Sequence, residues 1–179
     1  IFERIDGYDL SEVRRRLPGG LPARHMIWLM RRCLSVLGHA HARGVLHGNV
    51  DPQHILVRAS DHNVWLIDWC YAIVNPARSG KGFTCLNEVY SPPEVAARQP
   101  PLPSSDLYAL GKSIFFVLGG DPTQKTLPPD LDERLQRFLQ YCVLESPLSR
   151  AGDAWEAYRQ LDRLRADLYG PHQFVELYL

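Results

Sequence analysis

The chain has 179 residues, which is enough for one domain with a buried core. Apolar residues make up 45% of the sequence, so we do not expect a disordered chain. They form no run of about 18 residues, which argues against a membrane-spanning helix. Twenty basic and twenty acidic residues cancel, and this balance is not typical of a nucleic-acid-binding protein.

The four cysteines are scattered without a C-x-x-C pair, and the seven histidines do not combine with them in a zinc-binding pattern. We therefore expect reduced thiols and a cytoplasmic protein. Only three of the twenty basic residues are lysines, a bias that favours a GC-rich, bacterial source. The chain begins at Ile1 rather than at a methionine, so we expect it to be part of a longer protein.

Two helices are predicted near the N-terminus. Asp9 or Ser11 can cap a short helix that ends before the turn residues 18–20. A longer helix begins at Pro22 and stops near Gly44, because apolar residues recur between them at steps of three and four. The apolar stripe consists of Met26, Leu29, Met30, Cys33, Leu34, Leu37 and Ala40.

The middle of the chain has a different pattern. Short runs rich in β-branched residues predict strands at 45–46, 55–57 and 64–67. Residues 61–63, with the sequence Asp-His-Asn, predict a hairpin turn. Residues 72–93 show no period and many small residues, which predicts a long loop.

Three further helices are predicted towards the C-terminus. Residues 107–118 are apolar on nearly every side, which favours a buried helix. Residues 131–143 are amphipathic, and a last helix at 155–168 ends at Pro171. The tail at 174–179 is apolar and must pack against something.

The stretch after the second helix resembles the catalytic loop of protein kinases, H-R-D-x-x-x-x-N. It has His47, Gly48 and Asn49 at the first three places, and His54 at the last. Asp68 begins a D-W-C triplet that resembles the metal-binding D-F-G. In protein kinases the loop Asp orients the nucleophile, and the loop Asn and the D-F-G Asp hold magnesium. The resemblance thus places Asn49 and His54 where the chemistry needs Asp and Asn.

Three later motifs follow in the order that protein kinases have. Residues 90–94 (Y-S-P-P-E) resemble the A-P-E end of an activation segment. Residues 105–111 (S-D-L-Y-A-L-G) resemble the start of the central buried helix, and residues 146–150 (S-P-L-S-R) the late D-P-x-x-R segment. The resemblance implies a mainly α (α+β) fold: a kinase-like large lobe with small β-hairpins at the cleft.

The resemblance further implies a single domain over 1–179 from which the small lobe is absent. No glycine-rich loop precedes the catalytic loop, and all three lysines follow it. Any small lobe is therefore expected upstream. The implied parts are a hinge-like segment at 1–5, the catalytic-loop and metal-loop region at 44–71, the activation segment at 68–94 and a helical subdomain at 105–170.

Aminoglycoside and choline phosphotransferases form a rival lineage, since their loops read H-G-D-x-x-x-x-N followed by I-D-W. The pair His47-Gly48 and the triplet at 67–69 match that version locally. The later motifs match protein kinases better. Both lineages need Asp at the place of Asn49 and Asn at the place of His54.

The replaced residues are poor substitutes for the chemistry. Asn49 can hydrogen-bond a hydroxyl group but cannot accept its proton at neutral pH. His54 offers nitrogen where magnesium prefers oxygen ligands. Asp51 stands where serine/threonine kinases carry a lysine; we interpret it as a solvated turn residue, with a displaced catalytic base as the alternative. Gly48 replaces the Arg that would read a phosphorylated loop.

The positions with a structural role are kept. The resemblance implies that Glu94 pairs with Arg150, that Asp106 accepts backbone N–H groups of the catalytic loop, and that His47 packs beneath the metal loop. Asp68 either binds a metal or satisfies backbone donors at a turn, and both readings stay open.

We therefore expect a pseudokinase with a regulatory role that binds a protein partner or an attached domain and requires no cofactor. One alternative is an atypical ATP-dependent phosphotransferase, acting on serine/threonine or a small molecule and completed by an upstream lobe. Another is a nucleotide sensor that binds ATP and Mg²⁺ in the full-length protein without transfer. An apolar seam at 1–2, Trp69 and Tyr71 predicts self-association in preference to coverage by the tail.

Overall fold

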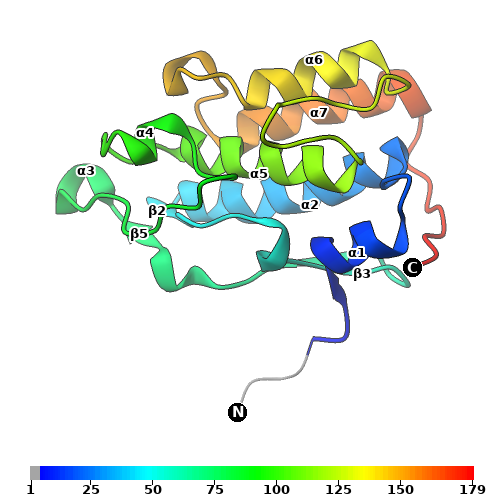
Figure 1. Ribbon diagram of the computed structural model, residues 1–179, viewed down its shortest axis with the longest axis horizontal. Coiled ribbons are helices and arrows are strands. Elements are labelled where there is room, and N and C mark those ends of the chain that lie inside the picture. The colour runs from blue at the N-terminus through cyan, green and yellow to red at the C-terminus, as the bar shows by residue number, and fades with distance from the viewer. Residues whose placement is uncertain (1–4) are drawn as a thin grey trace.

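The computed structural model describes residues 5–179, and its helices stack above two small β-ladders (Figure 1). Of the hinge-like segment expected at 1–5, only Ile5 lies within the described residues. The helices are α1 (Leu10–Arg16), α2 (Ala23–His41), α3 (Pro76–Ser79), α4 (Pro93–Ala96), α5 (Pro103–Val117), α6 (Glu133–Cys142) and α7 (Ala154–Tyr169). The strands are β1 (Tyr8–Asp9), β2 (Val45–Leu46), β3 (Ile55–Arg58), β4 (Asn63–Leu66) and β5 (Ile73–Val74), and the 3-10 helices are η1 (Pro52–His54), η2 (Trp69–Tyr71) and η3 (Pro147–Ser149).

The two N-terminal helices form where the sequence predicts them. Asp9 is the N-cap of α1, because its Oδ1 atom accepts a hydrogen bond of 2.8 Å from the backbone N–H of Glu12. Pro22 precedes the first turn of α2, where its missing N–H costs nothing. The predicted stripe of α2 is buried except for the half-buried Ala40, and it packs against α5 and α7.

The sheet consists of a hairpin and one added strand. β3 and β4 pair antiparallel, with Ile55 opposite Leu66, and β1 joins the free edge of β3. The turn between β3 and β4 holds His62 at a φ of 55°, in the left-handed region that tight turns need. The predicted hairpin is thus confirmed.

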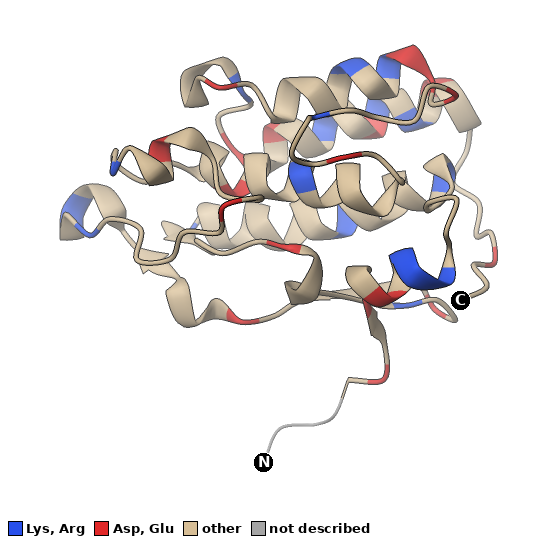
Figure 2. Cartoon of the chain, in the orientation of Figure 1, with Lys and Arg blue, Asp and Glu red and all other residues tan. Residues whose placement is uncertain are grey.

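The core lies around α5, which is buried on nearly every side because it carries apolar residues around its whole circumference. α6 buries one face and exposes the other, and charges of both signs cover the outer faces of α6 and α7 (Figure 2). No helix in the described part of the chain is long and apolar enough to cross a membrane.

The prediction of one long irregular loop at 72–93 was wrong in part. β5 lies in this stretch and pairs with β2, with Val45 opposite Val74, and α3 follows it directly. Both elements are too short to produce a periodic pattern in the sequence. β5 forms by pairing with β2, which lies almost thirty residues earlier in the chain.

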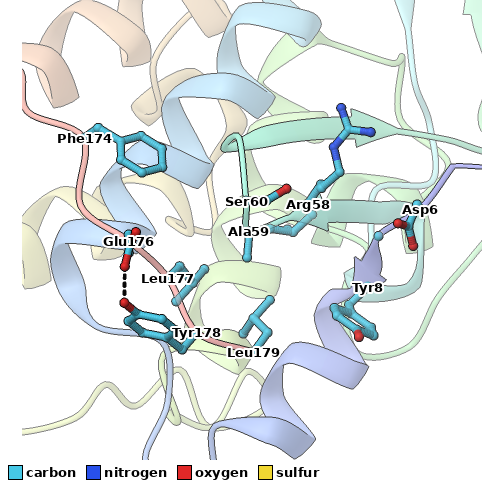
Figure 3. Close-up of a pocket in the computed structure, with 12 residues that line it drawn as sticks. Asp6, Tyr8, Arg58, Ala59, Ser60, Phe174, Glu176, Leu177, Tyr178 and Leu179 are labelled. Atoms are coloured by element: carbon cyan, nitrogen blue, oxygen red, sulfur yellow. Dashed lines mark hydrogen bonds between the residues drawn. The ribbon is translucent and has the colours of Figure 1, made fainter.

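The C-terminal tail packs on its own domain. Leu177 is buried in the hydrophobic core, and Leu179 is partly buried against it. Tail residues, β1 and the end of β3 enclose a cavity of about 530 Å³, in which Phe174 and Tyr178 stay largely exposed (Figure 3).

Candidate functional site

Asp106 of α5 anchors the backbone of the catalytic loop. Its two carboxylate oxygens accept the backbone N–H groups of His47 and Gly48, at 2.8 and 2.9 Å. Its Oδ2 atom also lies 2.9 Å from the Nε2 atom of His41, at the end of α2. Since Asp106 is 2% exposed, the loop is anchored to the helical core rather than free in solvent.

His47 is a buried, neutral histidine. Its Nε2 atom lies 2.9 Å from the Ile67 carbonyl oxygen, and its Nδ1 atom accepts the Asn49 backbone N–H at 3.3 Å. Burial lowers the pKa of the ring, and the carboxylate of Asp106 only partly opposes this. The ring packs 4.5 Å from that of Trp69, beneath the metal loop.

Asp51 caps a turn, and the expectation of a solvated side chain was wrong. Its Oδ1 atom accepts the backbone N–H groups of Gln53 and His54 at 2.8 and 3.2 Å. The Nδ2 atom of Asn87 lies 3.5 Å from its Oδ2 atom, and the residue is 7% exposed. The activation segment covers Asp51, which the local turn pattern does not reveal.

His54 contacts both the catalytic loop and Asp68 of the D-W-C triplet. Its Nδ1 atom lies 2.9 Å from the Asn49 carbonyl oxygen and 3.3 Å from the Oδ1 atom of Asp51. Its Nε2 atom lies 3.2 Å from the Oδ2 atom of Asp68. Of these ring contacts, the one between Nδ1 and the Asn49 carbonyl has hydrogen-bond geometry, and the other two place the ring between two carboxylates.

Asp68 is the most accessible carboxylate of this group, with 37% of its side chain exposed. It adopts a φ of 60°, so the backbone bends sharply at the start of η2. A hydrogen bond with the Cys70 thiol, helped by the nearby His54, lowers the pKa of Asp68. The carboxylate is therefore ionised and occupied by protein donors.

The residues at this site do not fit the magnesium that the kinase resemblance implies. Asp68 supplies one carboxylate, while His54 supplies nitrogen and its Nε2 atom lies against that carboxylate. Within residues 5–179, no three His, Cys, Asp or Glu side chains are grouped so that they could hold a metal ion. No step through a bound metal follows from this arrangement.

Gly48 lies where a side chain has no room. Its φ is 78°, and an added Cβ atom would lie 2.7 Å from the carbonyl oxygen of Tyr71. The Arg that the family carries at this place would therefore force the two backbone segments apart.

The activation segment is fastened to the helical core by Glu94 and Arg150. Their two side chains form a bidentate ion pair, with N–O distances of 2.6 and 3.0 Å. Ser105 donates a further bond to Glu94, and three backbone carbonyls accept the remaining N–H groups of Arg150. Burial raises the pKa of Glu94, but its bonds to Arg150 and its neighbours outweigh this and lower it overall.

The sequence analysis missed one participant, His41. His41 and Asp106 are 65 positions apart, so no local pattern connects them. Cys70 and Asn87 stand where the resemblance places a Gly and a Thr, and the structure sets Cys70 against Asp68 and Asn87 against Asp51. The Oδ1 atom of Asn87 accepts the backbone N–H groups two and three residues later, a turn signature that the sequence does contain.

Residues 1–158 match the protein kinase domain family. The chain belongs to this family. The match covers the catalytic loop, the D-W-C triplet, the activation segment and most of the helices.

Several serine/threonine kinases are similar to the chain. Serine/threonine-protein kinase F of Synechocystis is 30% identical over 69% of the chain, which spans 26% of that protein. Human serine/threonine-protein kinase D2 is 25% identical over 83% of the chain, which spans 17% of that protein. Human serine/threonine-protein kinase H1 is 24% identical over 90% of the chain, which spans 37% of that protein.

Proposed function

We propose that this protein kinase-like domain is a pseudokinase, which has lost phosphoryl transfer and acts through contacts with a protein partner or an attached domain. The observation that carries the proposal is the close contact between His54 and Asp68, whose Nε2 and Oδ2 atoms are 3.2 Å apart. An imidazole lies beside Asp68 where the second metal ligand should be, and the place of the catalytic base holds Asn49. Cysteine and arginine usage supports a cytoplasmic, bacterial setting.

The retained contacts support a binding role. Asp106 fixes the catalytic loop and the Glu94–Arg150 pair fixes the activation segment, and neither contact requires catalytic activity. Between Val117 and Glu133 the described chain contains no helix and only one isolated bridge. The resemblance places a substrate-docking helix there, so its absence argues further against phosphorylation of a protein substrate.

Asp51 does not support the rival reading of a displaced base. It is buried, and its Oδ1 atom already accepts two backbone N–H groups that hold the turn. Proton uptake would weaken both bonds.

The direct test is a transfer assay with the full-length protein that contains this domain. We expect no phosphate transfer from labelled ATP to itself or to generic substrates above a control without protein. An Asp68→Ala variant serves as the matched control. A magnesium-dependent rate that disappears in this variant would overturn the proposal.

A second candidate, nucleotide binding without transfer, is favoured by the exposed side chain of Asp68. Thermal-shift titrations of the full-length protein with ATP, with and without Mg²⁺, separate the two. A magnesium-dependent stabilisation that Asp68→Ala removes would identify a nucleotide sensor.

A further inference from the structure

A second cavity, of about 430 Å³, lies where α2, the turn between β3 and β4, α7 and the C-terminal tail meet. It shares no lining residue with the catalytic loop. Its wall includes Arg31 and Arg32 of α2, His62 of the turn, Tyr158 of α7, and His172 and Phe174 of the tail. We call this the tail cavity.

His62 is held rigidly in the wall of the tail cavity. Its ring stacks on Trp28 at 4.1 Å and faces Phe174 at 4.3 Å. The indole N–H of Trp28 donates to the backbone carbonyl of His62 at 2.9 Å, which fixes the turn as well. The residue is 9% exposed, and its ring is already within hydrogen-bonding reach of the Val175 backbone in the tail.

Arg31 carries an unused donor. Its terminal nitrogens bond to the Tyr158 hydroxyl at 2.8 Å, to Asp162 at 2.9 Å and to the Nε2 atom of His172 at 3.0 Å. Its Nε atom is buried and has no partner within the described residues. Buried polar atoms are rarely left unpaired, because each loses its bond to water. The unpaired Nε atom of Arg31 leaves this arginine with hydrogen-bonding capacity that the described residues do not use.

The field in the tail cavity is positive. Burial lowers the pKa of His62 and of His172, and the positive charge of arginines adds to this: that of Arg32 for His62, and chiefly that of Arg31 for His172. The Asp61 carboxylate, which lines the cavity, accepts two hydrogen bonds from the guanidinium of Arg58. Asp162 is shared between Arg31 and another arginine of α7. The negative groups nearby are therefore already neutralised.

We propose that the tail cavity binds a phosphate monoester. Arg31 and Arg32 supply the N–H donors and the positive charge for its oxygens, and the ring of His62 forms part of the wall. A phosphate dianion needs several donors at once, and arginines provide them in a fixed geometry. The rings of Trp28 and Phe174 leave an apolar wall for the organic part of the ester.

The volume suits an organic ligand rather than a single small ion, since small-molecule sites begin at about 300 Å³. The same phosphate chemistry is offered by a free metabolite and by a phosphorylated side chain of a partner. The site lies apart from the catalytic loop, so it does not depend on whether that loop is active.

The test is an NMR titration of the domain with phenyl phosphate at constant ionic strength, observed at the indole N–H of Trp28. We expect a saturable shift that phenol does not produce. Arg32→Gln should raise the dissociation constant about tenfold, the effect of one lost charge-assisted contact. Arg137→Gln is the matched control, because Arg137 lies on α6 with 71% of its side chain exposed, and it should change nothing.

Arg32→Gln is preferred over a change of Arg31, which also holds Tyr158 and Asp162 in place. Parallel titrations with inorganic phosphate and a phosphoserine peptide identify the source of the ester. Tighter binding of phenyl phosphate supports a free small molecule, and tighter binding of the peptide supports a phosphorylated partner. No saturable shift from any of these probes up to roughly 10 mM, or equal binding by the Arg32→Gln variant, would overturn the proposal.

Discussion

The Nε2 atom of His54 lies 3.2 Å from the Oδ2 atom of Asp68, so the side chain at the second metal position is within ion-pair distance of the first. The loop is therefore more than a kinase loop with two residues exchanged. The ring of His54 stands beside the carboxylate where a metal ligand would be needed, and its Nδ1 atom is hydrogen-bonded to the Asn49 carbonyl.

Releasing Asp68 should partly restore metal binding. In a His54→Asn variant the carboxylate loses its partner and gains an oxygen ligand beside it. We expect the affinity for Mn²⁺, measured by water proton relaxation, to rise about tenfold over the wild type, roughly the value of one added charged contact. The double variant His54→Asn with Asp68→Asn is the control and should lose the gain. Equal affinities of wild type and His54→Asn would contradict the role assigned to His54.

The Glu94–Arg150 pair should dominate the stability of the activation segment. Arg150→Ala leaves a buried carboxylate unpaired and should cost about 3–5 kcal/mol in the free energy of unfolding. The double change Glu94→Gln with Arg150→Met should cost less than the sum of the single changes. Urea melts measure all three. Arg134→Ala, which breaks only an exposed pair with Asp132, is the control and should cost less than about 1 kcal/mol. Additive effects would show that the two buried residues are not coupled.

Stability should fall when the pH drops below about 6.5. Burial lowers the pKa of His25, His47 and His62 in the folded state, whereas unfolding returns them to their ordinary value. Below pH 6.5 the unfolded state therefore binds more protons, and stability declines as the pH falls towards the lowered pKa values. Urea melts at pH 7.5, 6.5 and 5.5 measure the slope. A His47→Gln variant should be less stable at pH 7.5 but show a flatter slope, and an unchanged slope would contradict the buried neutral state of His47.

Thiol reactivity should divide the cysteines into two pairs. Cys33 and Cys142 are buried, and burial raises the pKa of each to about 12. Cys70 is exposed and Cys85 is partly so. We expect a disulfide reagent to modify Cys70 and Cys85 in the folded protein and the other two only after unfolding. Fast reaction of all four thiols in native buffer would show that the core opens readily.

The seam described in the sequence analysis is tested best at Tyr71. Its side chain is 37% exposed, whereas Trp69 packs on His47 and donates to the Leu66 carbonyl. If this face drives self-association, light scattering should show a dimer at high concentration that Tyr71→Asp dissociates. Leu148→Asp, at an exposed leucine of η3, controls for a general gain in solubility. A monomeric wild type would rule out this interface.

Much of the helical framework could be predicted from the sequence, because its signals are local. Asp9 caps α1 through a residue three positions away, and the stripe of α2 repeats within one helix. The family motifs also placed Glu94 and Arg150 together, although 56 positions separate them. In that case a resemblance, rather than a local pattern, carried the long-range information.

The rest could not be predicted, because it depends on which distant segments meet. β5 exists only as the partner of β2, and the contact of Asp51 with Asn87 of the activation segment spans 36 positions. His41 reaches Asp106 from the end of a different helix. The tail cavity combines residues from four elements, and none of them carries a motif.

The close approach of Gly48 to the Tyr71 carbonyl makes the lost arginine hard to regain. A single codon change at position 48 would insert a side chain into space that the backbone of η2 already occupies. Restoring the family residue would need a second, simultaneous rearrangement around Tyr71. The substitution Gly48→Arg alone is therefore not expected to produce a loop that reads phosphorylation.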